Sequence, residues 1–252
     1  MLGKNKIKYI HSLELRKYRK AEQAFVAEGH KLVGDLLGAF RPRMIIATAS
    51  WAQVHPDLSV EIVTDDELQR VSLLANPHDV LAVFAMRSDE IDAMASVSLV
   101  QEELCLALDE VQDPGNVGTI VRLADWFGIH HIFCSEGTAD VYNPKCVQAT
   151  MGALSRVHVH RTDLSTLLSS FPASTPVYGT FLDGRNIYQE PLTPNGLIVM
   201  GNEGSGIGHS VGTHIERRLF IPNYPIGSPS SESLNVAMAT GIVCAEFRRR
   251  NY

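Results

Sequence analysis

Three stretches of the chain combine glycines with polar side chains of the kinds that hold ligands. They are residues 116–122, 201–206 and 233–236, and each follows an apolar run typical of a strand. Glycines let backbone N–H groups approach a ligand closely. Amide, hydroxyl, carboxylate and guanidinium groups can hold polar or anionic atoms. Spread in this order over about half the chain, the stretches predict one ligand site built from loops at strand ends.

The middle stretch, Gly201-Asn202-Glu203-Gly204-Ser-Gly206, does not match the common phosphate-binding loops. No Lys-Ser/Thr pair follows, so it is not a P-loop, and the dinucleotide spacing would need a glycine where His209 stands. Read alone, an ordinary tight turn explains its glycines. That alternative leaves Glu203 unexplained.

The other two stretches also have purely structural interpretations. In the first, Pro114-Gly115 predicts a turn and Asn116 a helix cap. Arg122 stands in an otherwise apolar helix, where it either forms a salt bridge or reaches an anion. In the third, Ser231, Ser233 and Asn235 crowd the start of a helix, so at least one is expected to cap it.

Histidines and cysteines do not point to a metal centre. His158 and His160 share one face of a predicted strand, but no carboxylate or cysteine stands at ligand spacing. The four cysteines lack CxxC spacing, so we interpret them as reduced, mostly buried thiols of a cytoplasmic protein. A G-x-S-x-G pattern is present at residues 208–212, but it does not directly follow a predicted strand, as the nucleophile motif requires. We therefore expect neither a metal nor a catalytic serine.

The overall composition is that of a globular protein with a locally basic segment. With 45% hydrophobic and 20% charged residues and no apolar run of the ~18 residues that a membrane span requires, we expect no membrane partner. The net charge is −6, yet residues 1–43 hold ten Lys/Arg against four Asp/Glu. Such a segment can bind phosphates, although a solvated helix face explains the charge equally well.

The elements that position these residues separate into two halves. The first half alternates helices and short strands, with a helix at 11–22 and another that opens at Thr64 in a capping box with Glu67. It predicts a small α/β sandwich. A polar segment at 87–98 predicts a linker, and the domains are placed at 1–95 and 96–252.

The second half predicts a parallel sheet. Continuous apolar strands at 104–108, 131–134, 157–160, 177–180, 197–200 and 218–221 alternate with helices, including those at 119–127 and 234–248. In such sheets, ligands bind at the carboxyl ends of the strands. All three stretches are expected there.

Taken together, the motifs resemble a known family. Asn116-x-Gly118-x3-Arg122, Gly201-Asn202-Glu203-Gly204 and Ser233-Leu234-Asn235-Val236 are similar to the three motifs of the SpoU branch of the SPOUT RNA methyltransferases, over residues 104–250. The first half, through residues 17–20 and 25–31, resembles the RNA-binding domain, similar to a ribosomal protein, that precedes the catalytic domain in ribosomal-RNA 2'-O-methyltransferases.

The resemblance implies S-adenosylmethionine (SAM) as cofactor and an α/β-knot, a trefoil-knotted parallel sheet that pairs as a homodimer. It places the cofactor against Thr180, Gly201, Ile221 and Leu234, and the polar active site at Asn116, Arg122, Glu203, Ser233 and Asn235. It also gives structured RNA as the partner, with Arg16, Lys17, Arg19 and Lys20 binding its phosphates. The loop at 222–232 is several residues longer than in many relatives.

The implied reaction is methyl transfer to a ribose 2'-hydroxyl. Arginine is a poor base at neutral pH, so Arg122 is expected to hold an RNA phosphate and to stabilise developing negative charge. Ribosomal RNA is favoured over transfer RNA by the two-domain layout. Two alternatives stay open: a non-catalytic RNA-binding or ribosome-assembly protein of this fold and, less favoured by the glycine spacing, a nucleotide-binding oxidoreductase.

Overall fold

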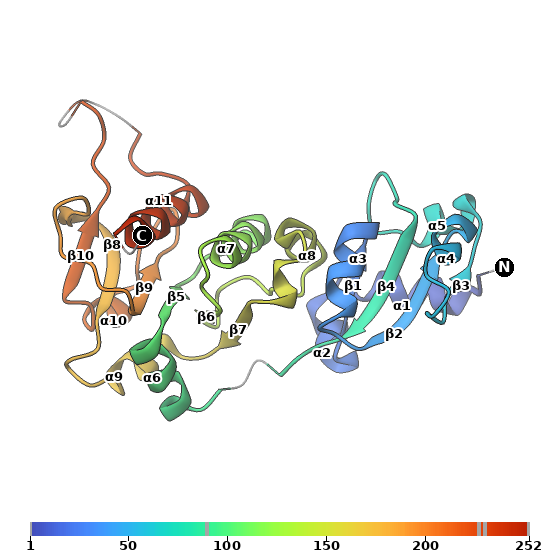
Figure 1. Ribbon diagram of the computed structural model, residues 1–252, viewed down its shortest axis with the longest axis horizontal. Helices are drawn as coiled ribbons and strands as arrows, with labels where there is room; N and C mark the ends of the chain where they lie inside the picture. Colours follow the sequence, from blue (N-terminus) through green and yellow to red (C-terminus); the bar gives the residue numbers. More distant parts are fainter. Residues whose placement is uncertain (1, 89–90, 226–227, 229–230, 251–252) are drawn as a thin grey trace. The chain divides into compact units, whose positions relative to one another are not determined.

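A computed structural model describes residues 2–88, 91–225, 228 and 231–250. The chain forms two compact units that interleave along the sequence. The N-terminal unit comprises Met1–Ser88 and Asp140–Arg156, and the C-terminal unit comprises Asp89–Ala139 and Val157–Tyr252. Figure 1 labels their helices and strands.

The N-terminal unit is built on a four-stranded sheet of order β1-β4-β2-β3. Strand β4 runs antiparallel to β1 and β2, and β2 runs parallel to β3. The strands are β1 (Ala24–Glu28), β2 (Pro42–Ala47), β3 (Glu61–Ile62) and β4 (Val80–Ala85). The helices are α1 (Lys4–Ser12), α2 (Arg16–Glu22), α3 (His30–Leu37), α4 (Ala49–Gln53), α5 (Asp65–Val71), α8 (Pro144–Thr150) and the short 3-10 helix η1 (Ala153–Ser155).

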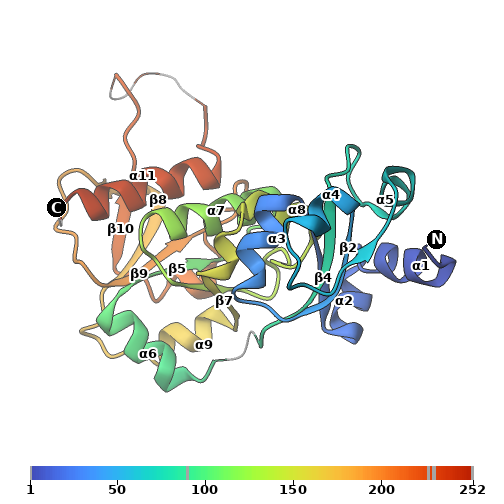
Figure 2. The ribbon, with the colours of Figure 1, turned by 45° about the vertical axis from the view of Figure 1, so that its right-hand side comes forward.

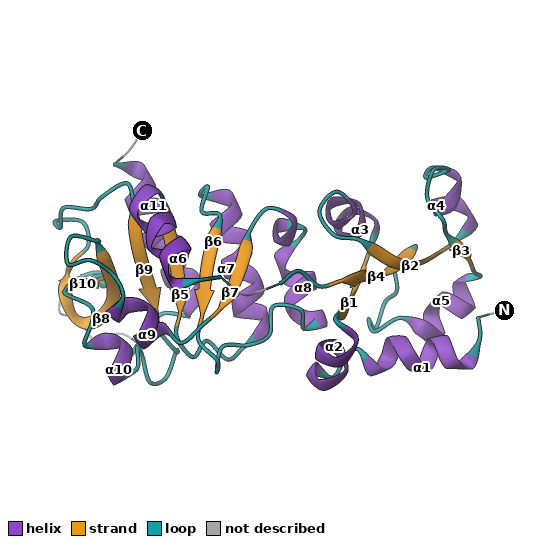
Figure 3. Ribbon diagram, turned by 90° about the horizontal axis from the view of Figure 1, so that it is seen from below, coloured by secondary structure: helices purple, strands orange, loops and turns teal. Residues whose placement is uncertain are grey.

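Both faces of this sheet are apolar and covered. On one face, α1 and α5 pack against alternate strand residues, among them Val26 and Val83. On the other, Phe25 and Phe84 turn towards Phe40 and Tyr142, and the Phe25 and Tyr142 ring centroids lie 4.8 Å apart. Figure 3 shows α3 and α4 on the side of the sheet opposite to α1 and α5. The α/β sandwich expected from the sequence is therefore present.

The helix expected at residues 11–22 is two helices. Helix α1 ends at Ser12, α2 begins at Arg16, and Leu13 between them is fully buried. The Arg19 guanidinium donates to the carbonyl oxygens of Leu13 and Glu14, at 2.8 and 2.7 Å, and thus satisfies carbonyl groups at the break. By contrast, the capping box of Thr64 and Glu67 is confirmed.

The segment Asp140–Arg156, from the middle of the second half of the sequence, folds with the N-terminal unit. The Gln148 side chain donates to the Glu28 carbonyl oxygen at 2.9 Å, and Asp140 pairs with Arg19. Arg87 donates to the carbonyl oxygens of Leu154 and Ser155. The core of this unit is therefore assembled from two distant parts of the chain.

The C-terminal unit holds a parallel six-stranded sheet of order β10-β8-β9-β5-β6-β7. Its strands are β5 (Leu104–Leu108), β6 (His131–Cys134), β7 (His158–Arg161), β8 (Val177–Asn186), β9 (Gly196–Met200) and β10 (Arg217–Phe220). Its helices are α6 (Ala93–Glu102), α7 (Pro114–Trp126), α9 (Leu164–Ser169), α10 (His209–Gly212) and α11 (Val236–Arg249). The predicted strands are confirmed within a residue at most ends, and β8 runs on beyond its predicted end.

Helices cover both faces of this sheet. Residues of α6, α9 and α10 form one core layer with every second residue of the strands, such as Ala107 and Val199. The helices α7 and α11 pack together on the opposite face, where the Tyr178 ring meets that of Phe247 edge-on at 4.9 Å. Figure 2 shows α7 and α11 above the sheet and α6 and α9 below it.

The boundary between the two units falls inside the segment at 87–98 that was expected to be a linker, between Ser88 and Asp89. Residues 89–90 lie outside the described residues, but from Ala93 the chain forms α6, whose N-cap Asp92 accepts a hydrogen bond from the Ala95 N–H at 2.8 Å. Ser96 and Val100 are buried, and α6 packs against β5 and β9. The second half of the segment is therefore helix, because small and polar residues fill a helix that packs closely. Within the described part of the chain, no helix is long and apolar enough to cross a membrane.

Candidate active site

Side chains from all three sequence motifs meet at the carboxyl ends of the central strands. The Asn116 amide donates through Nδ2 to Glu203 Oε1, and the Asn235 amide donates through Nδ2 to Asn116 Oδ1 at 3.0 Å. Ser233 Oγ donates to the Glu203 carbonyl oxygen at 3.4 Å. Four of the five predicted polar site residues therefore form one hydrogen-bonded network, which we call the amide–carboxylate network.

Helix α7 places Asn116 differently from the sequence prediction. The helix begins at Pro114 and its N-cap is Asp113, whose Oδ1 accepts from the Asn116 backbone N–H at 2.9 Å. Pro114 suits the first helical position, where no N–H partner is needed. Asn116 is thus not the cap. Its side chain is released from the helix end and is available to Glu203.

Asn235 serves two roles at once. Its Oδ1 accepts from the backbone N–H groups of Ala237 and Met238, at 3.1 and 3.3 Å, so it is the N-cap of α11. Because the oxygen is turned to the helix, Nδ2 must point away from it, towards Asn116. This orientation sets the direction of the whole network, with Glu203 as the final acceptor.

Arg122 lies outside the network. Its side chain is exposed on α7, and its guanidinium makes no hydrogen bond or ion pair with any residue that the structure describes. Of the two sequence interpretations, the internal salt bridge is therefore not found among the described residues. The guanidinium remains able to bind an external anion.

A pocket of about 900 Å³ adjoins the network. The four residues predicted to contact the cofactor all line it, namely Thr180, Gly201, Ile221 and Leu234, and so do Glu203 and Ser233. Asn116, Arg122 and Asn235 do not contribute to the lining that the structure describes.

The long loop at 222–232 also contributes to the pocket. Its residues 226–227 and 229–230 lie outside the described residues, whereas Pro222, Asn223, Ser231 and Glu232 line the pocket.

The loop after β9, at residues 201–208, is held near both of its ends by hydrogen bonds to the two residues that directly follow β5. Asn202 Nδ2 donates to the Glu110 carbonyl oxygen at 2.8 Å, and its Oδ1 accepts from the Gly204 N–H at 2.8 Å. The buried Asp109 accepts from the Gly208 N–H at 2.8 Å through Oδ2. Burial raises the pKa of the Asp109 carboxyl above its ordinary value. Sequence reasoning missed Asp109, although an acid directly after an apolar strand was a visible signal. Asn202 stood in the predicted middle stretch but was given no role.

Gly201 is required by packing within this loop. A Cβ on Gly201 would stand 2.4 Å from the backbone of Gly206 and Ile207. Its smallness therefore lets the loop fold back on its own start, which is a packing requirement in addition to the predicted ligand contact. Gly206, with a φ of +71°, supplies the left-handed residue at the turn.

The pocket has the chemistry to hold SAM. Its volume lies in the range of small-molecule sites, and such sites combine apolar walls with a few fixed polar groups. Here Ile221, Leu234 and Ile242 give apolar walls, the clamped loop offers backbone groups, and Glu203 brings a carboxylate suited to a cationic ligand. Together, the apolar walls, the backbone groups and the carboxylate fit a nucleoside that carries a positive charge.

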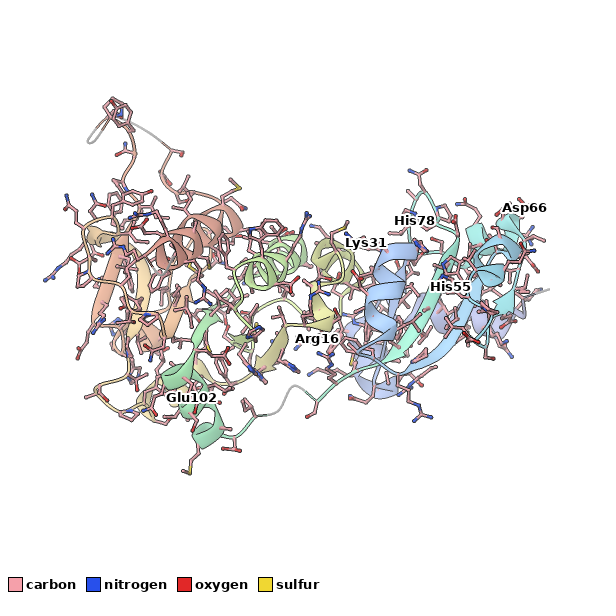
Figure 4. All side chains as sticks on the ribbon, in the orientation of Figure 1. Arg16, Lys31, His55, Asp66, His78 and Glu102 are labelled. Carbon is pink, nitrogen blue, oxygen red and sulfur yellow. The ribbon has the colours of Figure 1, made fainter. Side chains whose placement is uncertain are left out.

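The basic segment of the N-terminal unit differs from its prediction at one position. Arg16, Lys17 and Lys20 are exposed on α2, and Figure 4 labels Arg16 there. Arg19 is only 1% exposed, and its guanidinium binds Asp140 at 2.6 Å. Arg19 therefore cannot contact RNA phosphates, because its donors are used inside the fold.

The rings of His131, His158 and His160 form a stacked group on the neighbouring strands β6 and β7. His131 Nδ1 lies 2.9 Å from His160 Nε2, and their rings are nearly parallel. Burial lowers the pKa of His131. Within the described residues, no group of three or more His, Cys, Asp or Glu side chains could hold a metal ion. The stack is consistent with a structural role.

Comparison with known proteins assigns the fold to a class. The SpoU rRNA Methylase family matches residues 103–245, and the MRM3-like substrate binding domain matches residues 4–82. The chain belongs to the SpoU rRNA methylase family. The sequence resemblance and the predicted fold class, an α/β-knot domain preceded by a small α/β domain, are confirmed.

Individual relatives extend over nearly the whole chain. RlmP of Bacillus subtilis (strain 168), a 23S rRNA (guanosine(2553)-2'-O)-methyltransferase, is 29% identical over 249 residues and 96% of each chain is covered. A Porphyromonas gingivalis protein assigned to the TrmH family of RNA methyltransferases is 44% identical, with a TM-score of 0.89 and 99% of each chain covered. An AdoMet-bound rRNA methyltransferase of Sinorhizobium meliloti is 28% identical, with a TM-score of 0.86 over 100% of this chain and 97% of the other.

Proposed function

We propose that this protein is a SAM-dependent methyltransferase that modifies a ribose 2'-hydroxyl of ribosomal RNA. The observation that carries the proposal is the amide–carboxylate network, in which Asn116, Glu203 and Asn235, one from each motif, are joined beside a pocket suited to SAM. Two of the three named relatives are rRNA methyltransferases by name, and one of these two was solved with AdoMet bound. A non-catalytic protein of this fold would not need to keep all five polar residues.

The chain's own residues would hold the cofactor and the substrate in alignment. Thr180, Gly201, Ile221 and Leu234 would form the cofactor wall, and Asp109 and Asn202 keep the adjoining loop in place. When bound, SAM supplies an activated methyl group on a sulfonium centre. Transfer of such a group needs mainly alignment and removal of one proton.

Arg122 is proposed to act on the RNA. Arginine keeps its proton at neutral pH, so its guanidinium is suited to bind a phosphate bidentately and to stabilise charge that develops on the 2'-oxygen. Its lack of a described intramolecular partner supports this role. Ser233, near Glu203 at the pocket, is proposed to position the substrate.

A homodimer is part of the proposal. Trp126 on α7 and Met238 on α11 are 84% and 64% exposed, although both are large and apolar. These helices pack together on one face of the sheet, with Trp126 at the C-terminal end of α7 and Met238 at the N-terminal end of α11. Large apolar side chains left exposed in this way occur at protein interfaces. A second copy of the chain is the proposed occupant.

A cytoplasmic location also remains a proposal. All four cysteines are buried thiols that form no disulfide, which suits a reducing compartment. Burial raises the pKa of the Cys105 and Cys244 thiols to about 12, so neither provides a thiolate nucleophile at neutral pH. This is in accord with a reaction carried out without covalent catalysis by cysteine.

The proposal is tested by incubating the purified protein with isotopically labelled SAM and ribosomal RNA from cells that lack the gene. We expect label in the RNA at a position that resists alkaline cleavage, which marks a 2'-O-methyl group. Transfer RNA from the same cells is the matched control. Label in transfer RNA alone would show that transfer RNA, and not ribosomal RNA, is the substrate. Label in neither RNA would contradict the proposed activity.

A further inference from the structure

Helix α2 presents an exposed aromatic ring among cations. Arg16, Lys17, Tyr18 and Lys20 are all exposed, and Tyr18 retains 41% of its accessible surface. Figure 4 labels Arg16 on this helix. A large ring left in water among positive charges needs an explanation, because burying such a ring would stabilise the fold.

The helix is held rigidly from its inner side by Arg19. Its Nε and Nη2 both donate to Asp140 Oδ2, at 3.0 and 2.6 Å, and Nη1 donates to the Leu13 and Glu14 carbonyl oxygens. At the other end, Arg43 donates to the carbonyl oxygens of Glu22 and Gln23. A short helix fixed in this way presents its outer side chains in a set arrangement.

The outer cations have no partners within the fold. Arg16, Lys17 and Lys20 form no ion pair with the described residues, whereas Lys6 of the same unit pairs with Glu61. The acids nearest in sequence, Glu14 and Glu22, flank this group at its two ends. Three uncompensated cations within five residues favour a polyanion.

One face of the Tyr18 ring is already engaged by a cation. The Lys17 ammonium lies 4.7 Å from the ring centroid. Since a ring has two faces and Tyr18 is partly exposed, a planar group can stack on the other face while Lys17 stays beside it. An aromatic ring with adjacent cations is the arrangement by which proteins hold unpaired nucleotides.

We propose that Tyr18 is a stacking platform for an unpaired base of the RNA substrate, with Arg16, Lys17 and Lys20 binding the neighbouring phosphates. This inference rests on the proposed function and adds to it the kind of RNA element that is bound. A paired duplex offers no free base face, so the patch selects a loop, bulge or single-stranded end.

The test compares two labelled RNA hairpins by fluorescence anisotropy, one blunt and one with a short single-stranded oligouridine tail, and in both a non-nucleotide linker replaces the loop so that the blunt RNA has no unpaired base. Because stacking contributes about 1–3 kcal/mol per base, Tyr18→Ala should weaken binding of the tailed hairpin by about tenfold or more. Binding of the blunt hairpin should stay within about twofold, since its bases are already stacked. Tyr18→Phe keeps the ring and should restore the affinity for the tailed hairpin.

Leu15→Ala is the matched control, because Leu15 is an exposed apolar residue of the same turn that carries no ring. A 2-aminopurine base in the tail reports stacking directly: wild type should quench its fluorescence, and Tyr18→Ala should not. Urea unfolding followed by circular dichroism checks that each variant, including its N-terminal unit, is folded. Equal binding of the tailed hairpin by wild type and Tyr18→Ala would overturn the inference, as would a lack of preference for the tail in wild type. Labelling of ribosomal RNA by wild type tests the proposed function separately.

Discussion

Asn235 hydrogen-bonds to Asn116 across 119 residues of sequence, from Nδ2 to Oδ1 at 3.0 Å. Because Asn235 also caps α11, the helix N-terminus determines which way its amide points. That orientation requires Asn116 to accept on one side and to donate to Glu203 on the other. The cap of the last helix thus sets the geometry of a carboxylate at the cofactor pocket.

The substitution Asn235→Asp separates the two roles of Asn235, as the N-cap of α11 and as a donor in the amide–carboxylate network. The carboxylate can still accept from the α11 N–H groups, but it has no donor for Asn116 Oδ1. We expect the thermal midpoint to change little and kcat to fall by about tenfold or more, because the hydrogen bond that orients Asn116 towards Glu203 is lost. Asn235→Ala should instead cost about 1 kcal/mol in unfolding free energy through the lost cap. An unchanged kcat for Asn235→Asp would show that the network does not affect the reaction.

Arg122→Lys keeps the positive charge and removes the planar fork. If the guanidinium binds phosphate bidentately and stabilises the 2'-oxygen, kcat at saturating RNA should fall by about 10²-fold. Arg122→Gln removes the charge, so its kcat should fall at least as far. The SAM affinity measured by calorimetry should stay near the wild-type value in both variants. Turnover of Arg122→Lys equal to wild type would exclude the fork geometry.

The raised pKa of Asp109 predicts how the free energy of unfolding changes with pH. Its carboxyl has a raised pKa in the folded protein, so the folded state binds the proton more tightly than the unfolded state does. The contribution of Asp109 to unfolding free energy is therefore fully present below its ordinary pKa and decreases as the pH rises through the folded pKa. Urea unfolding of Asp109→Asn at several pH values should lack this decrease.

The same position tests the loop clamp. Asp109→Asn retains an oxygen that can accept from the Gly208 N–H, whereas Asp109→Ala leaves that N–H without its partner. We expect SAM affinity to be nearly unchanged for Asn and about tenfold weaker for Ala, as a lost acceptor costs about 1–3 kcal/mol. Equal SAM affinity for both variants would show that the loop does not depend on Asp109.

Two ion pairs of the same length differ in burial and should differ in energy. Arg19–Asp140 and Arg218–Asp183 both measure 2.6 Å, but the acid is 15% exposed in the first and 74% in the second. Asp140→Ala leaves the Arg19 charge buried and should lower the unfolding free energy by about 3–5 kcal/mol. Asp183→Ala is the control and should leave the unfolding free energy nearly unchanged, because solvent screens this exposed pair. Similar urea-unfolding curves for the two variants would contradict the structural role of Arg19.

The proposed dimer face is tested at Trp126. A carboxylate there would be desolvated on association, so Trp126→Glu should convert the dimer to a monomer in sedimentation equilibrium. Val54→Glu, at an exposed apolar residue of the N-terminal unit, should leave the dimer intact. A wild-type protein that sediments as a monomer would remove this part of the proposal.

Much of the architecture was predictable because its signals are local. An apolar run followed by glycine and polar residues marks a strand end, and the carboxyl ends of parallel strands lie at one edge of a sheet. The meeting of residues 116, 203 and 235 could therefore be expected. The capping box at Thr64 needed only four residues of sequence.

Side-chain partners were not predictable in the same way. Arg19 stands among three other cations and resembles them in every local respect, yet it is buried because Asp140, 121 residues away, packs against α2. Asn116 looked like a helix cap until Asp113 was found in that position. Likewise, the clamp of Asp109 on Gly208 joins residues 99 apart.

The sequence by itself determined the strands, the loops that carry the motifs, and the residue types at the site, because periodicity and turn chemistry act over a few residues. Only the tertiary structure decided which amide faces Glu203, which cations remain free for RNA, and that Asp140–Arg156 completes the N-terminal unit. Those outcomes depend on burial and on the pairing of distant groups, which exist only once the chain has folded.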